Sequence, residues 1–263
     1  GTWNVGHFNS APRNIEKLLF FIDMGNSGNI TIEDLTLAGA DGKNVKDDIL
    51  QLCTARGENG SNGFHLRMKA KNIIINSGTI NLGNGGAGGS SETISDCEKS
   101  SASGGTGGEP GNIKITATDN ISITQLHIIP GTGGAGGNAL AVAHTGVTSC
   151  PSEDGGDAHA VGGNGGANKK DLIAQGNIKG VQYIQVDRVI GGKGGNAVAR
   201  PGDGGNSAGC NCGGGNGGNG KAVAGNGGDA TVTIPISTSE GRGGDGGSTD
   251  AIGGKGGNGF NCT

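Results

Sequence analysis

The motif Gly-Gly-X-Gly-Gly occurs eight times, beginning at residues 85, 104, 133, 162, 191, 214, 243 and 253. Four consecutive starts, from 104 to 191, are 29 residues apart, and 214 and 243 are separated by the same distance. A chain with glycine at two of every three positions can adopt an extended helix of three residues per turn, in which only X projects outward. Inward glycines let neighbouring backbones approach closely. The repeat therefore predicts polyglycine II helices packed as a bundle, and not a flexible linker.

The X positions and a second motif extend this pattern. The X residues are mostly polar, as expected of a solvated face: Ala87, Thr106, Ala135, Asn164, Lys193, Asn216, Asp245 and Lys255. The second motif, Gly-Gly-(Asn/Asp)-Ala-x-Ala, occupies residues 136–141, 155–160 and 194–199, with a variant at 227–232. We predict that it forms a strand of small residues.

The composition requires a source of order other than large side chains. Glycine accounts for 61 of 263 residues and aromatic residues for only 3%. Ordering each residue costs roughly 1–2 kcal/mol of backbone entropy, which hydrogen bonds, crosslinks or neighbouring chains must offset. The six cysteines are even in number, and we interpret them as disulfide candidates whose pairing the sequence leaves open: Cys53, Cys97, Cys150, Cys210, Cys212 and Cys262. Zinc binding at Cys210 and Cys212 is disfavoured because only one residue separates them.

Alternating apolar residues predict β-strands, first at 28–37 and 72–82 and again at 111–124, 176–186 and 230–236. Residues 18–22 are expected to form a buried strand or cap, and 44–53 a helical turn or two. Recurring Asn-Ile pairs followed by glycine-rich excursions favour rungs of a parallel β-solenoid, with a β-sandwich as the alternative. We therefore predict an all-β, disulfide-stapled chain with a β region at 1–82, serving as cap or first rungs, continuous with a glycine-rich repeat region at 83–263.

The Gly-Gly-X-Gly-Gly repeats of residues 83–260 resemble known polyglycine II modules. These include the adhesin tips of bacteriophage tail fibres, snow flea antifreeze proteins and the N-terminal domain of Obg-type GTPases. The N-terminal strands and the Asn-Ile pairs are similar to secreted bacterial β-solenoid surface proteins. The resemblance is one of backbone type and implies an ordered glycine bundle without a particular activity.

The sequence offers few candidates for catalysis or ligand binding. No phosphate-binding glycine loop stands in a usable context, and the tandem calcium-binding repeat is missing, which leaves incidental calcium at Asp203, Asp229, Asp245 or Asp250. The group Asp154, Asp157 and His159 lacks a second carboxylate motif and is interpreted as part of a solvated loop. We therefore expect no catalytic, cofactor-binding or metal-binding residues, no cofactor, and no enzymatic activity.

Other sequence features concern location. Sequons occur at Asn29, Asn59, Asn120 and Asn261, a number that chance also explains in so Asn-rich a chain. No apolar stretch is long enough to span a bilayer, and a thinly spread net charge of −4 disfavours nucleic-acid binding. Paired cysteines favour an extracellular or cell-surface location.

Two functions fit these features. The first is a self-assembling extracellular structural subunit of a filament, sheath or surface layer, with identical subunits as partners. The alternative is an adhesin or phage receptor-binding tip that displays the excursions 90–103 and 146–157 to a cell-surface receptor or glycan. Ice binding is a third possibility, disfavoured because no regular Thr-x-Thr array is present.

Overall fold

A computed structural model describes residues 2–10, 19–38, 53–93, 96–171, 175–178, 180, 183–208, 212–233 and 241–258. These residues contain strands and no helix, as predicted for an all-β chain. Every strand pair among them is parallel. The short helix expected at 44–53 lies almost wholly outside the described residues.

The strands form five sheets. The largest has eight strands: β1 (Thr2–Ser10), β2 (Leu19–Asp23), β3 (Asn29–Ala38), β5 (His65–Asn81), β8 (Ile113–Ile123), β9 (Gln125–Ile129), β13 (Gln175–Ile178) and β14 (Tyr183–Val186). One four-stranded sheet has the order β20 (Thr249–Ala251), β16 (Ala197–Arg200), β10 (Ala139–Val142) and β6 (Ser91–Glu92). The other has the order β17 (Gly220–Val223), β11 (Asp157–Val161), β7 (Lys99–Ser103) and β4 (Thr54–Arg56). Two strand pairs complete the set: β12 (Asn168–Asp171) with β18 (Ala230–Thr233), and β15 (Val189–Ile190) with β19 (Gly241–Arg242).

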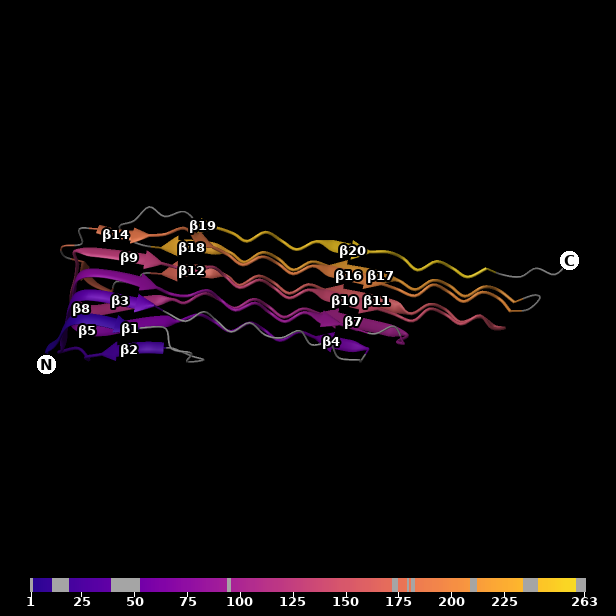
Figure 1. The fold of residues 1–263 in the computed structure, drawn as a ribbon, viewed down its shortest axis with the longest axis horizontal. Coiled ribbons are helices and arrows are strands. Elements are labelled where there is room, and N and C mark those ends of the chain that lie inside the picture. Colours follow the sequence, from indigo (N-terminus) through magenta and orange to yellow (C-terminus); the bar gives the residue numbers. More distant parts are fainter. Residues whose placement is uncertain are drawn as a thin grey trace.

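The molecule is elongated, and its two ends differ in construction (Figure 1). The eight-stranded sheet lies at one end, which we call the strand end. From it, glycine-rich segments run side by side to the other end, which we call the glycine end (Figure 1). Strands from both sides of residue 82 share the eight-stranded sheet, so the two sequence regions interleave in space.

The strand end buries a core of large aliphatic side chains. In register, Ile30 of β3 pairs with Ile73 of β5, which pairs with Ile121 of β8, and each is at most 2% exposed. Alternate residues of these strands point inward, as the apolar alternation predicts. Strands are therefore confirmed within four of the predicted ranges, and within 230–236 for the described residues 230–233. Of the predicted cap, β2 is a strand, and Ile22 packs against this core.

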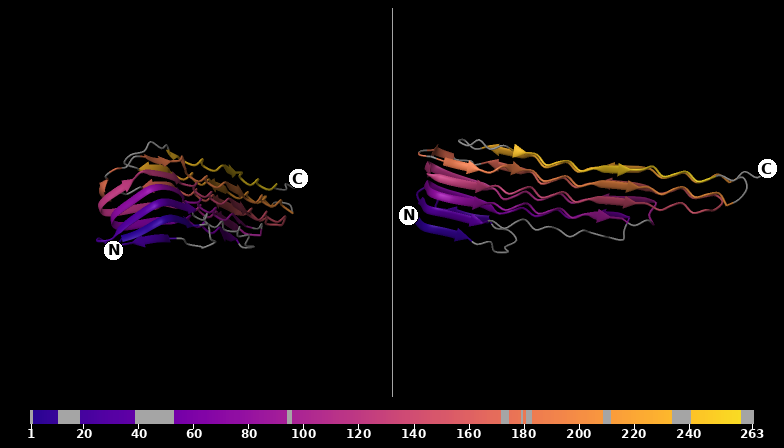
Figure 2. Two further views of the ribbon diagram at one scale, coloured as in Figure 1. Left: turned by 60° about the vertical axis from the view of Figure 1, so that its left-hand side comes forward. Right: turned by 45° about the horizontal axis from the view of Figure 1, so that its top comes forward.

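The glycine segments lie in two layers (Figure 2). The first layer contains residues 53–64, 99–112, 153–168 and 213–230, and the second contains 83–93, 131–147, 189–207 and 241–258. Segments within a layer run parallel, and the chain returns along the opposite layer, so successive segments alternate between layers. Two segments of the second layer begin at glycines with positive φ, Gly83 at 71° and Gly131 at 70°. Only glycine adopts this conformation readily, so it suits the turn from strand into segment.

Alanine methyl groups fill the space between the two layers. Ala139 and Ala141 of β10, with Ala158 and Ala160 of β11, are at most 2% exposed and belong to one cluster. These residues come from the Gly-Gly-(Asn/Asp)-Ala-x-Ala motif, which the structure confirms as a strand of small residues. The 29-residue spacing also has a structural basis. Neighbouring segments of one layer are separated in sequence by one segment of the other layer, so residues two repeats apart stand side by side, as Leu140 and Val198 do at a separation of 58.

Candidate functional site: an open hydrogen-bonding edge

Each Gly-Gly-X triplet inside the stack makes the same set of backbone bonds. In the triplet 165–167, the amide of the first glycine, Gly165, donates to the carbonyl of Asn226 in the next segment of its own layer, at 2.8 Å. We call the glycine after X the first glycine and the one that follows it the second glycine. The amide of the second glycine, Gly166, donates to the carbonyl of Gly134 in the opposite layer, at 2.8 Å. The glycine pairs 107–108, 136–137 and 194–195 make the same two bonds. These backbone bonds join successive segments within and between layers.

The X side chains also bond neighbouring segments, which was not predicted from the sequence. Asn164 Oδ1 accepts the amide hydrogen of Asn226 at 2.9 Å, and Asn138 Oδ1 accepts that of Asn196 at 2.9 Å. Asp203 Oδ1 does the same for Lys255 at 2.7 Å. The X side chains lie on the exposed face. An Asn or Asp at X nevertheless accepts a hydrogen bond from the amide of the X residue in the next segment, which donates to no described backbone carbonyl. The signal in the sequence is the frequency of Asn and Asp at X.

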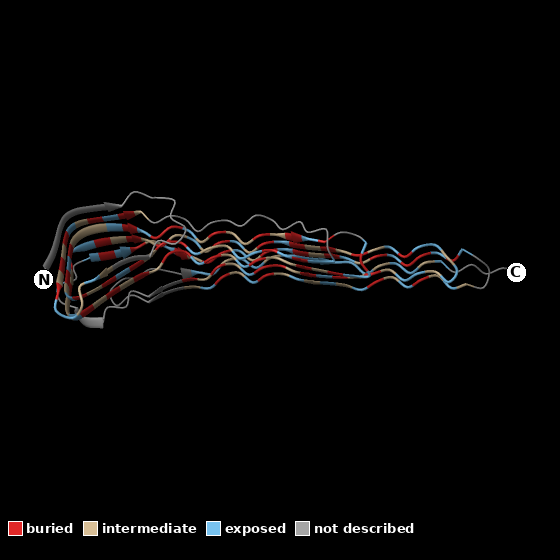
Figure 3. Cartoon of the chain, turned by 90° about the horizontal axis from the view of Figure 1, so that it is seen from below, coloured by how far each residue is buried: buried red, intermediate tan, exposed pale blue. Residues whose placement is uncertain are grey.

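The close packing excludes side chains from the glycine positions. A Cβ placed on Gly163 would lie 2.0 Å from the carbonyl oxygen of Gly105, and one on Gly194 would lie 2.0 Å from that of Gly225. These oxygens belong to the backbone and cannot rotate away. Burial along the segments repeats every three residues, with X most often exposed and the preceding glycine most often buried (Figure 3). Glycine is therefore required in the interior by contact with neighbouring chain.

In the last segment, 241–258, this requirement is lifted at the first glycine of each pair, whereas the second glycines still face backbone, as at Gly254, where a Cβ would lie 2.1 Å from the carbonyl oxygen of Gly202. A Cβ on Gly253 would meet no atom within 4 Å, and one on Gly243 would lie 3.6 Å from its nearest atom. The first-glycine amides of this segment donate to no described residue: Gly243, Gly246, Gly253 and Gly256. The same holds in the neighbouring segment for Gly214, Gly217 and Gly227. We call segments 213–230 and 241–258 together the open edge.

The opposite side of the stack has a different composition. Segment 53–64 carries Glu58 and Ser61 at second-glycine positions, where their carbonyls accept from Gly89 and Gly86 at 2.8 Å. Where segments 131–147 and 153–168 extend furthest, Val147 and Glu153 occupy the equivalent places, and Val147 is 58% exposed. Glycine is thus replaced on one side of the stack, whereas the first-glycine positions of segment 241–258 keep it, although a Cβ there would lie no closer than 3.6 Å to a described neighbour.

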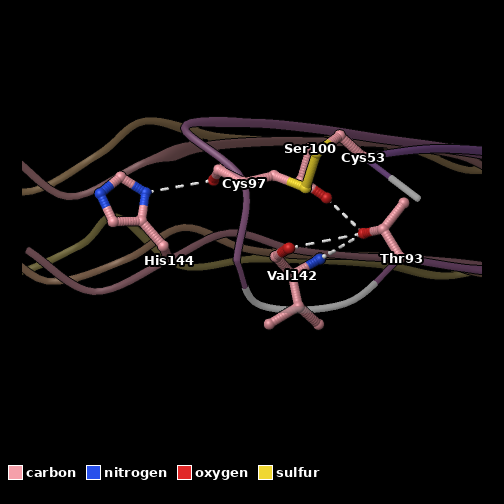
Figure 4. The surroundings of a disulfide bond; sticks show 6 residues. All are labelled: Cys53, Thr93, Cys97, Ser100, Val142 and His144. Atoms are coloured by element: carbon pink, nitrogen blue, oxygen red, sulfur yellow. Dashed lines mark hydrogen bonds between the residues drawn. A yellow bond between two sulfur atoms is a disulfide. The ribbon is translucent and has the colours of Figure 1, made fainter. Parts of the chain in front are cut away.

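Two disulfides hold neighbouring segments of the first layer together. Cys53 is bonded to Cys97, 44 residues apart, and Cys150 to Cys212, 62 residues apart. Both bonds lie within the chain, and Cys210 and Cys262 fall outside the described residues. Beside the first bond, the Thr93 hydroxyl contacts Ser100 and accepts the amide hydrogen of Val142 at 3.0 Å (Figure 4).

The glycosylation candidates fall in two environments. Asn29 and Asn120 form a ladder with Asn72, in which the Asn72 amide donates to Asn29 Oδ1 at 2.8 Å and the Asn120 amide to Asn72 Oδ1 at 2.9 Å. The side-chain nitrogen of Asn120 is thus engaged as a donor, whereas Asn29 takes part through its oxygen. Asn59 is exposed at an X position, where its Oδ1 accepts the amide hydrogen of Thr106 at 2.9 Å. Asn261 lies outside the described residues.

The carboxylates considered for catalysis take part in the X-face pattern. Asp154 Oδ1 accepts the amide hydrogen of Asn216 at 2.7 Å, and Asp157 Oδ1 accepts that of Asn219 at 2.7 Å. His159 lies two residues after Asp157 in the same strand, β11, in register with Ser101 and Lys221. Within the described residues, no group of three or more His, Cys, Asp or Glu side chains could hold a metal ion. In the same part of the chain, no helix is long and apolar enough to cross a membrane.

Comparison with known proteins found little. No family model matches the chain, and no curated protein matches it. One solved structure is similar, a springtail antifreeze protein from Granisotoma rainieri described as a bundle of nine polyproline type II helices whose crystal waters match the ice lattice. It is 21% identical over 83% of this chain and 93% of that chain, with a TM-score of 0.14. A likeness this weak carries no argument about fold or function.

Proposed function

We propose that the chain is a self-assembling extracellular structural subunit and that its open edge is the contact surface. The glycine segments would be polyglycine II helices, and each pair of segments with its strands would form one rung of a parallel β-solenoid. The three-residue repeat of bonds and burial supports the helices, and the parallel register of successive strands supports the rungs. The two disulfides fit an oxidising, extracellular setting.

The retained glycines of the open edge carry the proposal. A Cβ at Gly243, Gly246, Gly253 or Gly256 would lie no closer than 3.6 Å to another segment that the structure describes, so alanine would fit at each. Glycine costs roughly 0.5–1 kcal/mol relative to alanine in regular structure, since its unfolded state has more freedom. Inside the stack the same positions are glycine because another segment packs against them. A further segment packed on the open edge would give these glycines the same role.

A second copy of the chain is the partner that this edge fits. The unpaired amides recur every three residues, so the partner must offer carbonyls at the same repeat, and the glycine segments of this chain do. A row of unpaired backbone groups is a template for pairing with another chain. Because Glu58, Val147 and Glu153 stand in glycine positions on the other side, the open edge is the side suited to backbone contact.

Sedimentation velocity over a range of concentrations, with negative-stain electron microscopy, tests this assembly. We expect growth of large, regular particles with concentration. The double variant Gly253→Ala/Gly256→Ala places two methyl groups on the contact face and should raise the concentration needed for assembly about tenfold or more. Lys255→Ala, on the X face of the same segment, is the matched control and should assemble normally. A wild-type chain that stays monomeric at high concentration would rule the proposal out.

The adhesin is retained as a second candidate because of the disulfide at the glycine end. Cys150–Cys212 clamps the connection between segments 131–147 and 153–168 at a projecting position, as a display scaffold would need. Of the predicted display excursions, residues 91–92 and 99–103 form strands in which Ser91 and Ser100 are buried, whereas Val147, Thr148, Cys150 and Pro151 of the connection after Gly146 are exposed. Binding of the monomer to cell surfaces or a glycan array, lost on replacing residues 147–149, would support display over assembly.

A further inference from the structure

The open edge also changes the chemistry of Asn-Gly pairs. In an Asn-Gly sequence, the glycine amide nitrogen can attack the asparagine side-chain carbonyl, because glycine has no Cβ to hinder the approach. Attack forms a five-membered succinimide and expels ammonia. Water then opens the ring to leave aspartate or isoaspartate. The reaction needs a free glycine amide and a side chain that can rotate toward it.

An identical pentapeptide occurs inside the stack and at the open edge. Residues 162–166 and 214–218 both read Gly-Gly-Asn-Gly-Gly, so their local sequences favour the reaction equally. Only the packing around Asn164 and Asn216 differs. The chain thus contains its own matched comparison.

Inside the stack, both reacting groups are held by the next segment. The amide of Gly165 donates to the carbonyl of Asn226 at 2.8 Å, and Asn164 Oδ1 accepts the amide hydrogen of Asn226 at 2.9 Å. The nucleophile and the electrophile are therefore fixed to one neighbouring residue. The same double restraint applies to three more pairs, Asn59-Gly60, Asn62-Gly63 and Asn84-Gly85.

At the open edge, neither group is held. The amide of Gly217 donates to no described residue, and Asn216, which is exposed, has no side-chain bond within the described part of the chain. Asn226 and Gly227 follow β17 in the same segment. The Gly227 amide likewise donates to no described residue, and the exposed Asn226 side chain has no bond within the described residues. The backbone of Asn216 remains anchored to Asp154, but its side chain and the following amide are free to move.

We propose that Asn216 and Asn226 are sites of spontaneous deamidation and that the stack protects Asn59, Asn62, Asn84 and Asn164. The products differ in their effect. Aspartate at X keeps the acceptor oxygen, as Asp154 and Asp203 do for the amides of Asn216 and Lys255. Isoaspartate adds one atom to the backbone and shifts the following residues out of the three-residue repeat. Isoaspartate at the open edge would therefore spoil the surface that a further segment pairs with.

Peptide mapping by mass spectrometry tests the proposal on the intact, oxidised protein. The dilute protein is incubated in mildly alkaline buffer, and each Asn-Gly peptide is followed for conversion of the amide to a carboxylic acid. Isoaspartate is counted separately with an enzymatic isoaspartyl assay. We expect Asn216 and Asn226 to react about ten- to a hundredfold faster than Asn164, as expected for the loss of two hydrogen bonds. Equal rates at Asn164 and Asn216 would overturn the proposal.

The same measurement on reduced protein in urea separates structure from local sequence. Without the stack, Asn164 and Asn216 should react at the same rate because their pentapeptides are identical. A difference that persists in urea would show that distant sequence, and not packing, sets the rates. That result would also contradict the inference.

Discussion

At the strand end, isoleucine and leucine side chains of β3, β5 and β8 fill the interior, whereas at the glycine end the interior contains alanine methyl groups and bare backbone. A core of large side chains loses stability in proportion to the volume removed, and neighbours can partly relax. Backbone packed on backbone has no side chains to rearrange, so any added atom must displace a segment. The two ends should therefore respond in opposite ways to small changes of volume.

The largest expected effect comes from adding one methyl group inside the glycine end. In Gly163→Ala the new Cβ would lie 2.0 Å from the carbonyl oxygen of Gly105, so the segments must separate and lose hydrogen bonds. We expect a loss of more than about 3 kcal/mol in the free energy of unfolding, measured by urea denaturation. Gly253→Ala, where no atom lies within 4 Å, is the control and should leave monomer stability unchanged or slightly raised. Similar losses for both variants would contradict close backbone packing.

A smaller effect is expected from removing one methyl group at the strand end. Ile73 is fully buried between Ile30 and Ile121, so Ile73→Val leaves a small cavity. The free energy of unfolding should fall by about 0.5–1.5 kcal/mol. Denaturation of this variant beside Gly163→Ala compares the two ends directly. If losing a methyl at Ile73 costs more than gaining one at Gly163, the contrast between the ends fails.

The sequence predicted the strand end well because its signals are local. Apolar alternation places Ile30 and Ile73 inward whatever their neighbours are, and the strands appear where it predicts them. The register between strands is not local: residues 111–124 contain two Asn-Ile pairs, at 112–113 and 120–121, and the structure places Ile113 opposite Leu66 and Asn120 opposite Asn72. A strand that continues past one repeat offers two such pairs, and only the three-dimensional register chooses between them.

The glycine end was predicted in outline, because the triplet repeat and the alanine motif are also local. The role of the X side chains was not, since an exposed Asn has the same sequence signature whether or not it accepts a hydrogen bond. The open edge could not be predicted either. Gly165 and Gly217 lie in identical pentapeptides, and only the presence or absence of a neighbouring segment distinguishes them.

The smallest expected effect concerns the X face, where side chains of the glycine end accept hydrogen bonds from the neighbouring segment. Asn164→Ala removes the oxygen that accepts the amide hydrogen of Asn226, while Asn164→Asp keeps a carboxylate oxygen there. Because water can replace the lost partner at this exposed position, we expect Asn164→Ala to cost only about 0.5–1 kcal/mol in urea denaturation. Hydrogen exchange at the Asn226 amide is the more direct measurement: it should accelerate in Asn164→Ala and stay slow in Asn164→Asp. Unchanged exchange in the alanine variant would mean that the X side chains only cover the surface, and that the glycine end is held by backbone alone.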